Sequence, residues 1–300
     1  QAFQFRGGDR LATELSSIIP RTLVFLAGMT HPDEGISFFN DAALGIAPSL
    51  KELEAYSQGL GISNPKSEPK FGLSVFEETG YIRLNANSAV AILDVAPIGP
   101  DYLPGHAHAD TLSFELSVKE ERVIVNSGTS VYQPGLIRES QRTTAAHSTV
   151  EIDGYSSSEV WGSFRVAKRA YPKYLKKKVG SDKILVECSH NGYLRLPGRP
   201  TPTRSWTWRH NGITIEDTIE GSFGTALARY YFSPDVFKIK REANRYLIRL
   251  KSGNVIDINV EIGDSIIAEA MYFPEFGVCQ PSNCLEVKMV DGKSHVRFEW

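Results

Sequence analysis

The feature that most constrains the fold is a series of short apolar segments, β-branched or alternating, that begins after Phe71. Glycine, proline, asparagine and aspartate separate these segments, as is typical of strands joined by turns. The segments span residues 81–84, 89–95, 111–118, 122–125, 149–152, 183–187, 214–219, 246–250 and 257–260. This pattern predicts a mainly β chain that folds as a large antiparallel β-sandwich over residues 71–300.

The N-terminal part carries a different pattern, in which apolar residues recur at helical spacing. These residues are Leu11, Leu15, Ile18, Ile19, Leu23 and Leu26. Pro20 falls inside this segment and is expected to kink or split the helix. Ser49 and Glu52 form a capping-box pattern, which predicts a second helix that ends near Leu60. We therefore expect a helical segment at 1–62 and a linker at 63–70 before the sandwich.

Composition argues against several functional classes. The 300 residues carry a formal net charge of −2, which argues against a nucleic-acid partner bound through bulk charge. No run of 18 apolar residues is present, so no transmembrane helix is expected. Neither a P-loop nor a G-x-G-x-x-G motif follows a strand segment. Three cysteines are too few for a disulfide framework, and Cys279 and Cys284 either pair across a turn or remain thiols.

Two of the seven histidines, His106 and His108, lie two residues apart beside an apolar segment. In a strand they would share one face with Asp110 and with the even-numbered apolar residues up to Leu116. Buried polar groups cost free energy unless they are paired, so imidazoles and a carboxylate that continue an apolar stripe indicate a site. The alternative is a pair of strand-entry histidines that are hydrogen-bonded to their neighbours.

Several motifs follow one another in a fixed order. They are residues 105–116 (GHAHADTLSFEL), 125–129 (VNSGT), 142–154 (RTTAAHSTVEIDG) and 161–166 (WGSFRV). Together with an N-terminal stretch at 31–48, they resemble the heparinase II/III-like family of polysaccharide lyases over roughly residues 20–235. The resemblance implies an incomplete (α/α) toroid followed by a β-sandwich, with residues 1–62 as the last toroid helices. Gln1 is not an initiator methionine, so we expect a processed or truncated chain.

The resemblance also implies a chemistry, the β-elimination of uronic-acid polysaccharides, which needs a base and groups that neutralise the uronate. It implies that His106 is catalytic and that His108, Asn126 and His147 hold a metal ion. Two imidazoles and an oxygen donor suit zinc, but the neutral amide of Asn126, where some relatives carry Asp, weakens this ligand set. The alternatives are a turn residue at Asn126 and a strand-entry histidine at His147.

Basic and aromatic residues lie near these motifs in the sequence. Arg138, Arg142 and Arg165 would fit the recognition of sugar carboxylates, or they form a solvated basic edge strand. Trp161 would fit stacking on a sugar ring, or it belongs to the core. The partner that these residues imply is an acidic polysaccharide.

Relatives take a tyrosine, and an asparagine or histidine, from toroid helices that are not in these 300 residues. We therefore expect the chain alone to be inactive, and the family suggests a periplasmic or cell-envelope location for the whole protein. The competing function is a non-catalytic glycan-binding or structural module with a relic metal site. The sequence leaves open which polysaccharide is bound and which oligomer forms.

Overall fold

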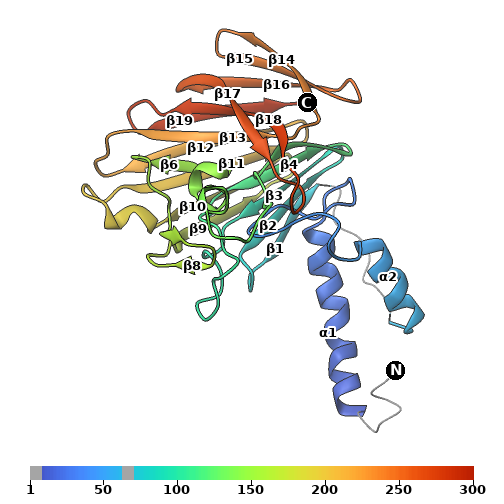
Figure 1. Cartoon of the computed structure of the whole chain (residues 1–300). Helices are drawn as coiled ribbons and strands as arrows, with labels where there is room; N and C mark the ends of the chain where they lie inside the picture. Colours follow the sequence, from blue (N-terminus) through green and yellow to red (C-terminus); the bar gives the residue numbers. More distant parts are fainter. Residues whose placement is uncertain (1–8, 63–70) are drawn as a thin grey trace.

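The computed structural model describes residues 9–62 and 71–300 and confirms a mainly β chain preceded by helices (Figure 1). Helix α1 spans Asp9–Gly28 and α2 spans Leu50–Gly59, whereas a third helix, α3 (Leu136–Arg142), is inserted in the β region. The capping box at the start of α2 is present, since Ser49 and Glu52 each accept a hydrogen bond from the other's backbone N–H. The expected linker at 63–70 lies outside the described residues.

Two large antiparallel sheets form the sandwich. The first contains, in spatial order, β1 (Gly72–Phe76), β2 (Tyr81–Ala86), β3 (Ala89–Asp94), β4 (Phe114–Val118), β5 (Glu121–Val125), β13 (Ala226–Phe232), β18 (Gln280–Lys288) and β17 (Asp264–Tyr272), with β6 (Val150–Ile152) also paired to β13. The second contains β14 (Val236–Glu242), β15 (Arg245–Leu250), β16 (Val255–Ile262), β19 (Lys293–Glu299), β12 (Gly212–Glu220), β11 (Thr201–Arg209), β10 (Lys183–His190) and β9 (Pro172–Val179). The short strands β7 (Val160–Trp161) and β8 (Arg165–Val166) form a separate hairpin.

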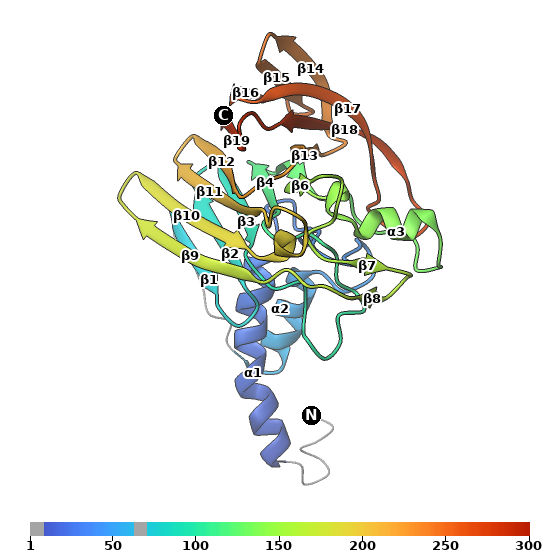
Figure 2. The same ribbon diagram turned by 90° about the vertical axis from the view of Figure 1, so that its left-hand side faces the viewer.

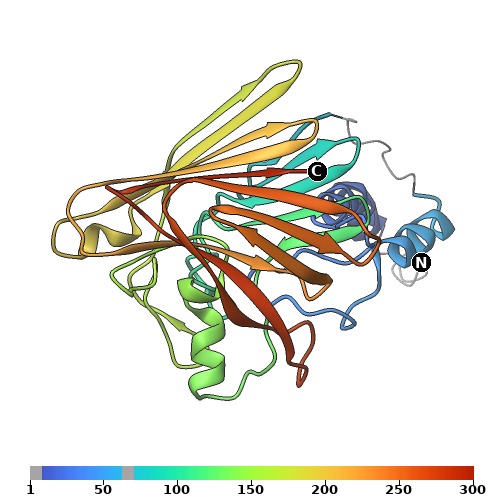
Figure 3. The same cartoon turned by 90° about the horizontal axis from the view of Figure 1, so that it is seen from above.

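The hydrophobic core lies between these two sheets. Strand alternation turns Trp206 and Trp208 of β11 inward, where both are fully buried. They share the core with Phe114, Tyr230 and Phe298, which come from both sheets. Seen from above, strands of the two sheets overlie one another, and α1 is viewed nearly along its axis (Figure 3).

The end of α1 covers the outer face of the first sheet, while the rest of this helix projects away from the sandwich (Figure 2). Phe25 and Met29 pack with Phe39 against Val90 and Ile92 of β3. Strand β3 is therefore buried on both faces, which explains its continuous apolar sequence. None of the helices in the two described ranges is both long and apolar enough to cross a bilayer.

Three local expectations are settled by the structure. Helix α1 is not split at Pro20, because the missing proline N–H removes one helical hydrogen bond while the turns on either side keep theirs. Strand β4 begins only at Phe114, and the preceding residues form turns in which Leu112 has φ +65°, so the same-face argument for the two histidines is wrong. Cys279 and Cys284 are free thiols.

Candidate active site

Five segments that are distant in the sequence converge on one carboxylate, that of Asp41. They are the loop between α1 and α2, which carries Asp41, the turns before β4, residues 126–131 after β5, helix α3, and the tip of the β7–β8 hairpin, which is linked to Asp41 through Arg138. Asn40 adopts the left-handed conformation (φ +56°) that asparagine tolerates well. Its side-chain oxygen accepts the backbone N–H of His108 at 3.1 Å, which ties the loop to the turns before β4.

Asp41 is the centre of a hydrogen-bond network although its side chain is only 4% exposed. Its Oδ1 lies 2.8 Å from His108 Nε2 and 3.2 Å from the Thr129 hydroxyl, and Oδ2 lies 2.9 Å from His106 Nδ1. Arg138 donates to both oxygens in a bidentate pair. Burial alone would raise the pKa of Asp41, but the hydrogen bonds from His108 and Arg138 lower it well below its usual range. Asp41 is therefore a carboxylate in the folded protein.

His106 is the exposed member of this network, with 63% of its side chain accessible to solvent. Its ring lies beside those of Tyr132 and Phe164, with centroid distances of 5.6 and 5.8 Å. Within the described ranges, no hydrogen bond involves its Nε2. The histidine thus offers one ring nitrogen to a bound molecule, while the other faces Asp41.

His108 and His147 are both buried and face each other, with 3.1 Å between His108 Nδ1 and His147 Nε2. The remaining nitrogen of each ring contacts a pure acceptor, Asp41 for His108 and the Thr143 carbonyl for His147 (2.7 Å). Those nitrogens must carry the hydrogens, so the two facing nitrogens both present lone pairs when the rings are neutral. Two lone pairs at this distance are unfavourable unless a proton or a cation lies between them.

The charge state of this pair follows from its burial. Burial lowers the pKa of His108 below its usual value. Burial and the neighbouring His108 lower the pKa of His147 to about 3. Both rings are therefore neutral near pH 7, which is the form in which imidazole binds metals.

Comparisons with known proteins agree with this architecture. The family profile described as "Heparinase II/III-like, C-terminal" matches residues 68–300. The chain belongs to the heparinase II/III-like family. No curated protein matches it in a sequence search.

Two solved structures have a similar fold. Heparan sulfate lyase HepC from Pedobacter heparinus has a TM-score of 0.72 at 16% identity, and the match covers 92% of this chain and 45% of HepC. A heparinase III crystal structure has a TM-score of 0.75 at 14% identity, with 99% of this chain and 51% of that protein covered. This chain thus spans about half the length of either protein, and at these identities the likeness concerns the fold.

The third metal ligand inferred from the family resemblance, Asn126, has a different set of contacts. Its side-chain oxygen accepts the Ser148 N–H at 3.1 Å, and its backbone N–H donates to Glu115 at 3.2 Å. Its amide nitrogen is buried without a hydrogen-bond partner in the described part of the chain. Among the described residues, no group of three or more His, Cys, Asp or Glu side chains could hold a metal ion. Asn126 therefore holds the backbone next to His147, and the two facing imidazoles have no third His, Cys, Asp or Glu ligand in the described part of the chain.

Two of the three proposed sugar-binding arginines are internal. Arg138 and Arg142 lie on α3 rather than on a strand, and both are fully buried. Arg142 donates to the carbonyls of Ala107 and Gly162, and Arg138 donates to Ser163 as well as to Asp41. The expectation of either substrate-facing or solvated arginines is therefore wrong here, because backbone carbonyls and a carboxylate use their guanidinium groups.

These buried arginines fix the β7–β8 hairpin beside His106, and Figure 2 shows α3 next to this hairpin. The hairpin presents Trp161 and Arg165 on its surface. Trp161 is 50% exposed, so it is not a core residue, and the Arg165 guanidinium lies 4.6 Å from its ring centroid. This stacked pair is accessible to solvent.

Sequence reasoning missed the residue that organises the site. Asp41 lies within the N-terminal stretch that carries the family resemblance, but no spacing rule links it to His106 or Arg138. His190, a further buried histidine, accepts the Gly192 N–H at 3.1 Å and serves the turn after β10.

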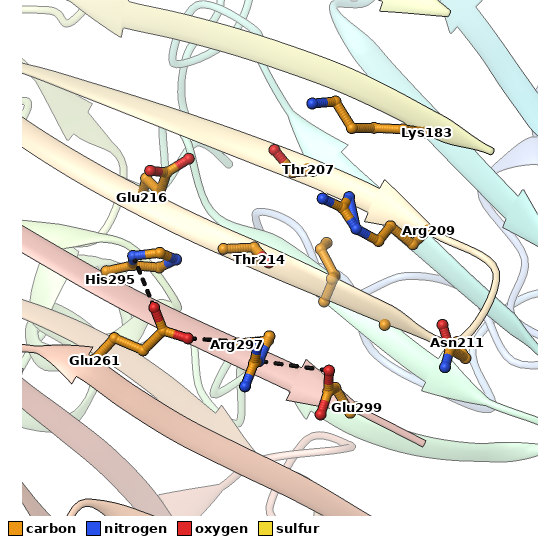
Figure 4. Close-up of a pocket in the computed structure, with 12 residues that line it drawn as sticks. Lys183, Thr207, Arg209, Asn211, Thr214, Glu216, Glu261, His295, Arg297 and Glu299 are labelled. Atoms are coloured by element: carbon orange, nitrogen blue, oxygen red, sulfur yellow. Dashed lines mark ion pairs between the residues drawn. The ribbon is translucent and has the colours of Figure 1, made fainter. Parts of the chain in front are cut away.

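A separate hollow of about 340 Å³ lies on the outer face of the second sheet (Figure 4). Four of its charged side chains form ion pairs with one another. His295 and Arg297 both contact Glu261, and Arg297 also contacts Glu299. The hollow shares no residue with the Asp41 network, and its paired charges are typical of a solvated sheet face.

Proposed function

We propose that this chain is the C-terminal part of a polysaccharide lyase that cleaves uronic-acid-containing glycans by β-elimination. Membership of the heparinase II/III-like family supports a polysaccharide lyase domain. The observation that carries the proposal is His106, an exposed imidazole held on a buried carboxylate. Its ring lies beside Phe164, which belongs to the same hairpin as the solvent-accessible Trp161–Arg165 pair.

The chemistry requires a base, an acid and a neutralised uronate. The base removes the C5 proton, the electron pair forms a C4=C5 double bond, the C4–O4 bond breaks, and the leaving oxygen takes up a proton. His106 would face the C5 proton or the uronate carboxylate. A tyrosine, and an asparagine or histidine, from the toroid helices of the whole protein would complete the site.

A divalent cation, for which we propose zinc, would be held by His108 and His147, with Asn126 as a candidate oxygen donor. The facing lone pairs of the two imidazoles support this assignment. When bound, the ion would supply fixed positive charge beside Asp41. Elemental analysis of protein purified without chelator should find about one zinc per chain, and His147→Gln should lose it. Metal-free protein would refute the assignment while leaving the proposal for His106 intact.

The sugar-binding surface on this chain would be the β7–β8 hairpin. Trp161 offers a ring face for stacking on a pyranose, and Arg165 offers a guanidinium for a carboxylate or sulfate group. This combination selects acidic glycans over neutral ones.

The test is to incubate the full-length protein with alginate, heparan sulfate and a bacterial exopolysaccharide, and to follow the absorbance of unsaturated uronate ends. We expect steady product formation on at least one of these. Tight binding without unsaturated product on an extended panel of acidic glycans would instead support the glycan-binding module.

A further inference from the structure

We propose that Asp41 is a positioning residue that holds His106 in the Nδ1–H tautomer and thereby directs the Nε2 lone pair to the substrate. The catalytic meaning of this assignment rests on the proposed lyase function, but the tautomer itself does not. Asp41 lies outside residues 68–300, which match the family's C-terminal domain, so the site on the sandwich depends on a residue from the preceding helical segment.

The tautomer follows from the identity of the contacting groups. His106 Nδ1 lies 2.9 Å from Asp41 Oδ2, a hydrogen-bond distance. The bidentate pair with the Arg138 guanidinium requires the carboxylate form of Asp41, whose two oxygens can only accept hydrogen bonds. The hydrogen must therefore be on Nδ1, and in the neutral ring Nε2 carries the lone pair.

Asp41 can impose this geometry because its carboxylate cannot rotate freely. The bidentate pair with the buried Arg138 fixes its plane, and His108 and Thr129 occupy Oδ1, so that Oδ2 is directed at His106. A surface histidine with 63% exposure would otherwise sample several orientations.

The backbone that carries Asp41 is fixed as well. The preceding residue, Asn40, donates its N–H to Asp110 at 3.2 Å and its side-chain amide to the Tyr81 hydroxyl at 3.2 Å. Its amide oxygen accepts the His108 N–H. These three bonds to β2 and to the turns before β4 locate the Asp41 side chain relative to His106.

The consequence for the reaction is that the lone pair of His106 lies on Nε2, the ring nitrogen that does not face Asp41. A neutral imidazole that is protonated on Nδ1 can accept a proton, or a hydrogen bond, only through Nε2. Within the described part of the chain, Nε2 of His106 has no hydrogen-bond partner. If His106 lost Asp41, the ring would divide its population between two tautomers and several rotamers, and fewer molecules would be competent.

The primary test is two-bond proton–nitrogen NMR of the ¹⁵N-labelled 300-residue chain, at a pH where His106 is neutral. The His106 signals are assigned as those lost in His106→Ala. We expect the Nδ1–H pattern, with a protonated Nδ1 and an unprotonated Nε2. An Nε2–H pattern, or a mixture like that of a solvent-exposed histidine, would overturn the proposal. This measurement needs no activity, so it stands even if the lyase proposal fails.

The variant test compares two carboxylates of one loop. Asp41→Asn should shift His106 towards a tautomer mixture, whereas Asp33→Asn, which removes the partner of the buried Arg122, should leave the tautomer unchanged. In the full-length enzyme, Asp41→Asn should lower kcat by about tenfold to a hundredfold with a smaller change in KM. Unchanged kcat, or an unchanged tautomer in a folded Asp41→Asn chain, would contradict the proposal. If that variant does not fold, the wild-type spectrum still decides.

Discussion

Two polar clusters attach the loop between α1 and α2 to the sandwich, and they have the same kinds of groups. The Asp41 cluster contains Asp41, Arg138 and the histidines His106, His108 and His147. The Glu115 cluster contains Glu115, His31, Ser117, Arg122 and Asp33. Both combine imidazole, carboxylate and guanidinium groups, so composition alone does not distinguish them.

The difference between the clusters is access to solvent. His31 and Glu115 are fully buried, and both ring nitrogens of His31 are occupied, by Ser117 at 2.7 Å and by Glu115 at 2.9 Å. In the Asp41 cluster, His106 keeps one nitrogen without a partner in the described part of the chain and exposes most of its ring. A cluster closed to solvent can only stabilise the fold, whereas an open one can also act on a bound molecule.

The largest expected effect concerns the whole site. If the proposed function holds, the 300-residue chain alone should show no steady lyase turnover on alginate, heparan sulfate or a bacterial exopolysaccharide, because the proposal takes the remaining catalytic groups from toroid helices of the whole protein. Proximity and orientation supply much of an enzyme's rate, so half of a cleft should lose nearly all of it. Absorbance of unsaturated ends, with the full-length protein in parallel, is the measurement. Clear turnover by the chain alone would show that the Asp41 cluster needs no partner domain.

The next effect separates chemistry from stability within the Asp41 cluster. His106→Ala in the full-length protein should lower kcat by about a hundredfold or more, as expected for a general acid–base group. Its unfolding free energy should change by less than about 0.5 kcal/mol, because the side chain is mostly exposed. His210→Ala is the matched control, since His210 is also exposed but stacks on Phe71, away from the site. Near-normal turnover in His106→Ala would mean that the Asp41 cluster, like the Glu115 cluster, only stabilises the fold.

The Glu115 cluster should give the opposite result. Glu115 accepts hydrogen bonds from His31 and from the N–H groups of Phe38 and Asn126. Glu115→Ala would leave these three buried donors without their acceptor and would remove one of the two carboxylates beside Arg122, at a cost of about 3–5 kcal/mol. Urea unfolding of the 300-residue chain measures this. A loss below about 1 kcal/mol would mean that the cluster contributes little to docking the loop.

Periodicity explains why the fold could be predicted and the site only in part. Strand alternation depends on neighbours along the chain, so residues such as Trp206 and Trp208 disclose the sandwich from sequence alone. Asp41 and Arg138 are 97 residues apart, and nothing local indicates that they pair. From the sequence, Arg138 and Arg142 were therefore predicted to lie on the surface. In the structure both are buried and form long-range hydrogen bonds.

The histidines also show how far a prediction from local sequence reaches. The spacing of His106 and His108 predicted a site, but through a strand that does not exist at that point. Turns place the two rings on opposite oxygens of Asp41 instead. His31, for which the sequence suggested no role, becomes the central imidazole of the closed cluster because Glu115 and Ser117 lie on one face of β4.

Acidification should affect the closed cluster through His31. Burial lowers the pKa of His31 below its usual value, so below about pH 6.5 the unfolded chain binds a proton that the folded chain does not. Stability should therefore fall as the pH decreases from about 6.5, by up to about 1.4 kcal/mol per pH unit, and this term should be flat above pH 7. Urea midpoints between pH 7.5 and 5 measure the slope, which His31→Gln should reduce. Ser117→Ala keeps the imidazole and should keep the slope; equal slopes in all three proteins would contradict this account.

The smallest effect concerns Arg165, which is exposed, in contrast to the buried Arg138 and Arg142. Arg165 is exposed and stacks on Trp161, so Arg165→Ala should leave the melting temperature unchanged. It should weaken the binding of an acidic glycan to the 300-residue chain by about two- to fivefold, since an exposed ionic contact contributes up to roughly 1 kcal/mol. The deficit should shrink as salt screens the interaction. Lys240→Ala removes an equal charge from β14, in the second sheet, and serves as the control. If Arg165→Ala and Lys240→Ala weaken binding equally, the glycan responds only to the net charge of the chain. A loss confined to Arg165→Ala would show that the glycan binds at the β7–β8 hairpin, beside the Asp41 cluster.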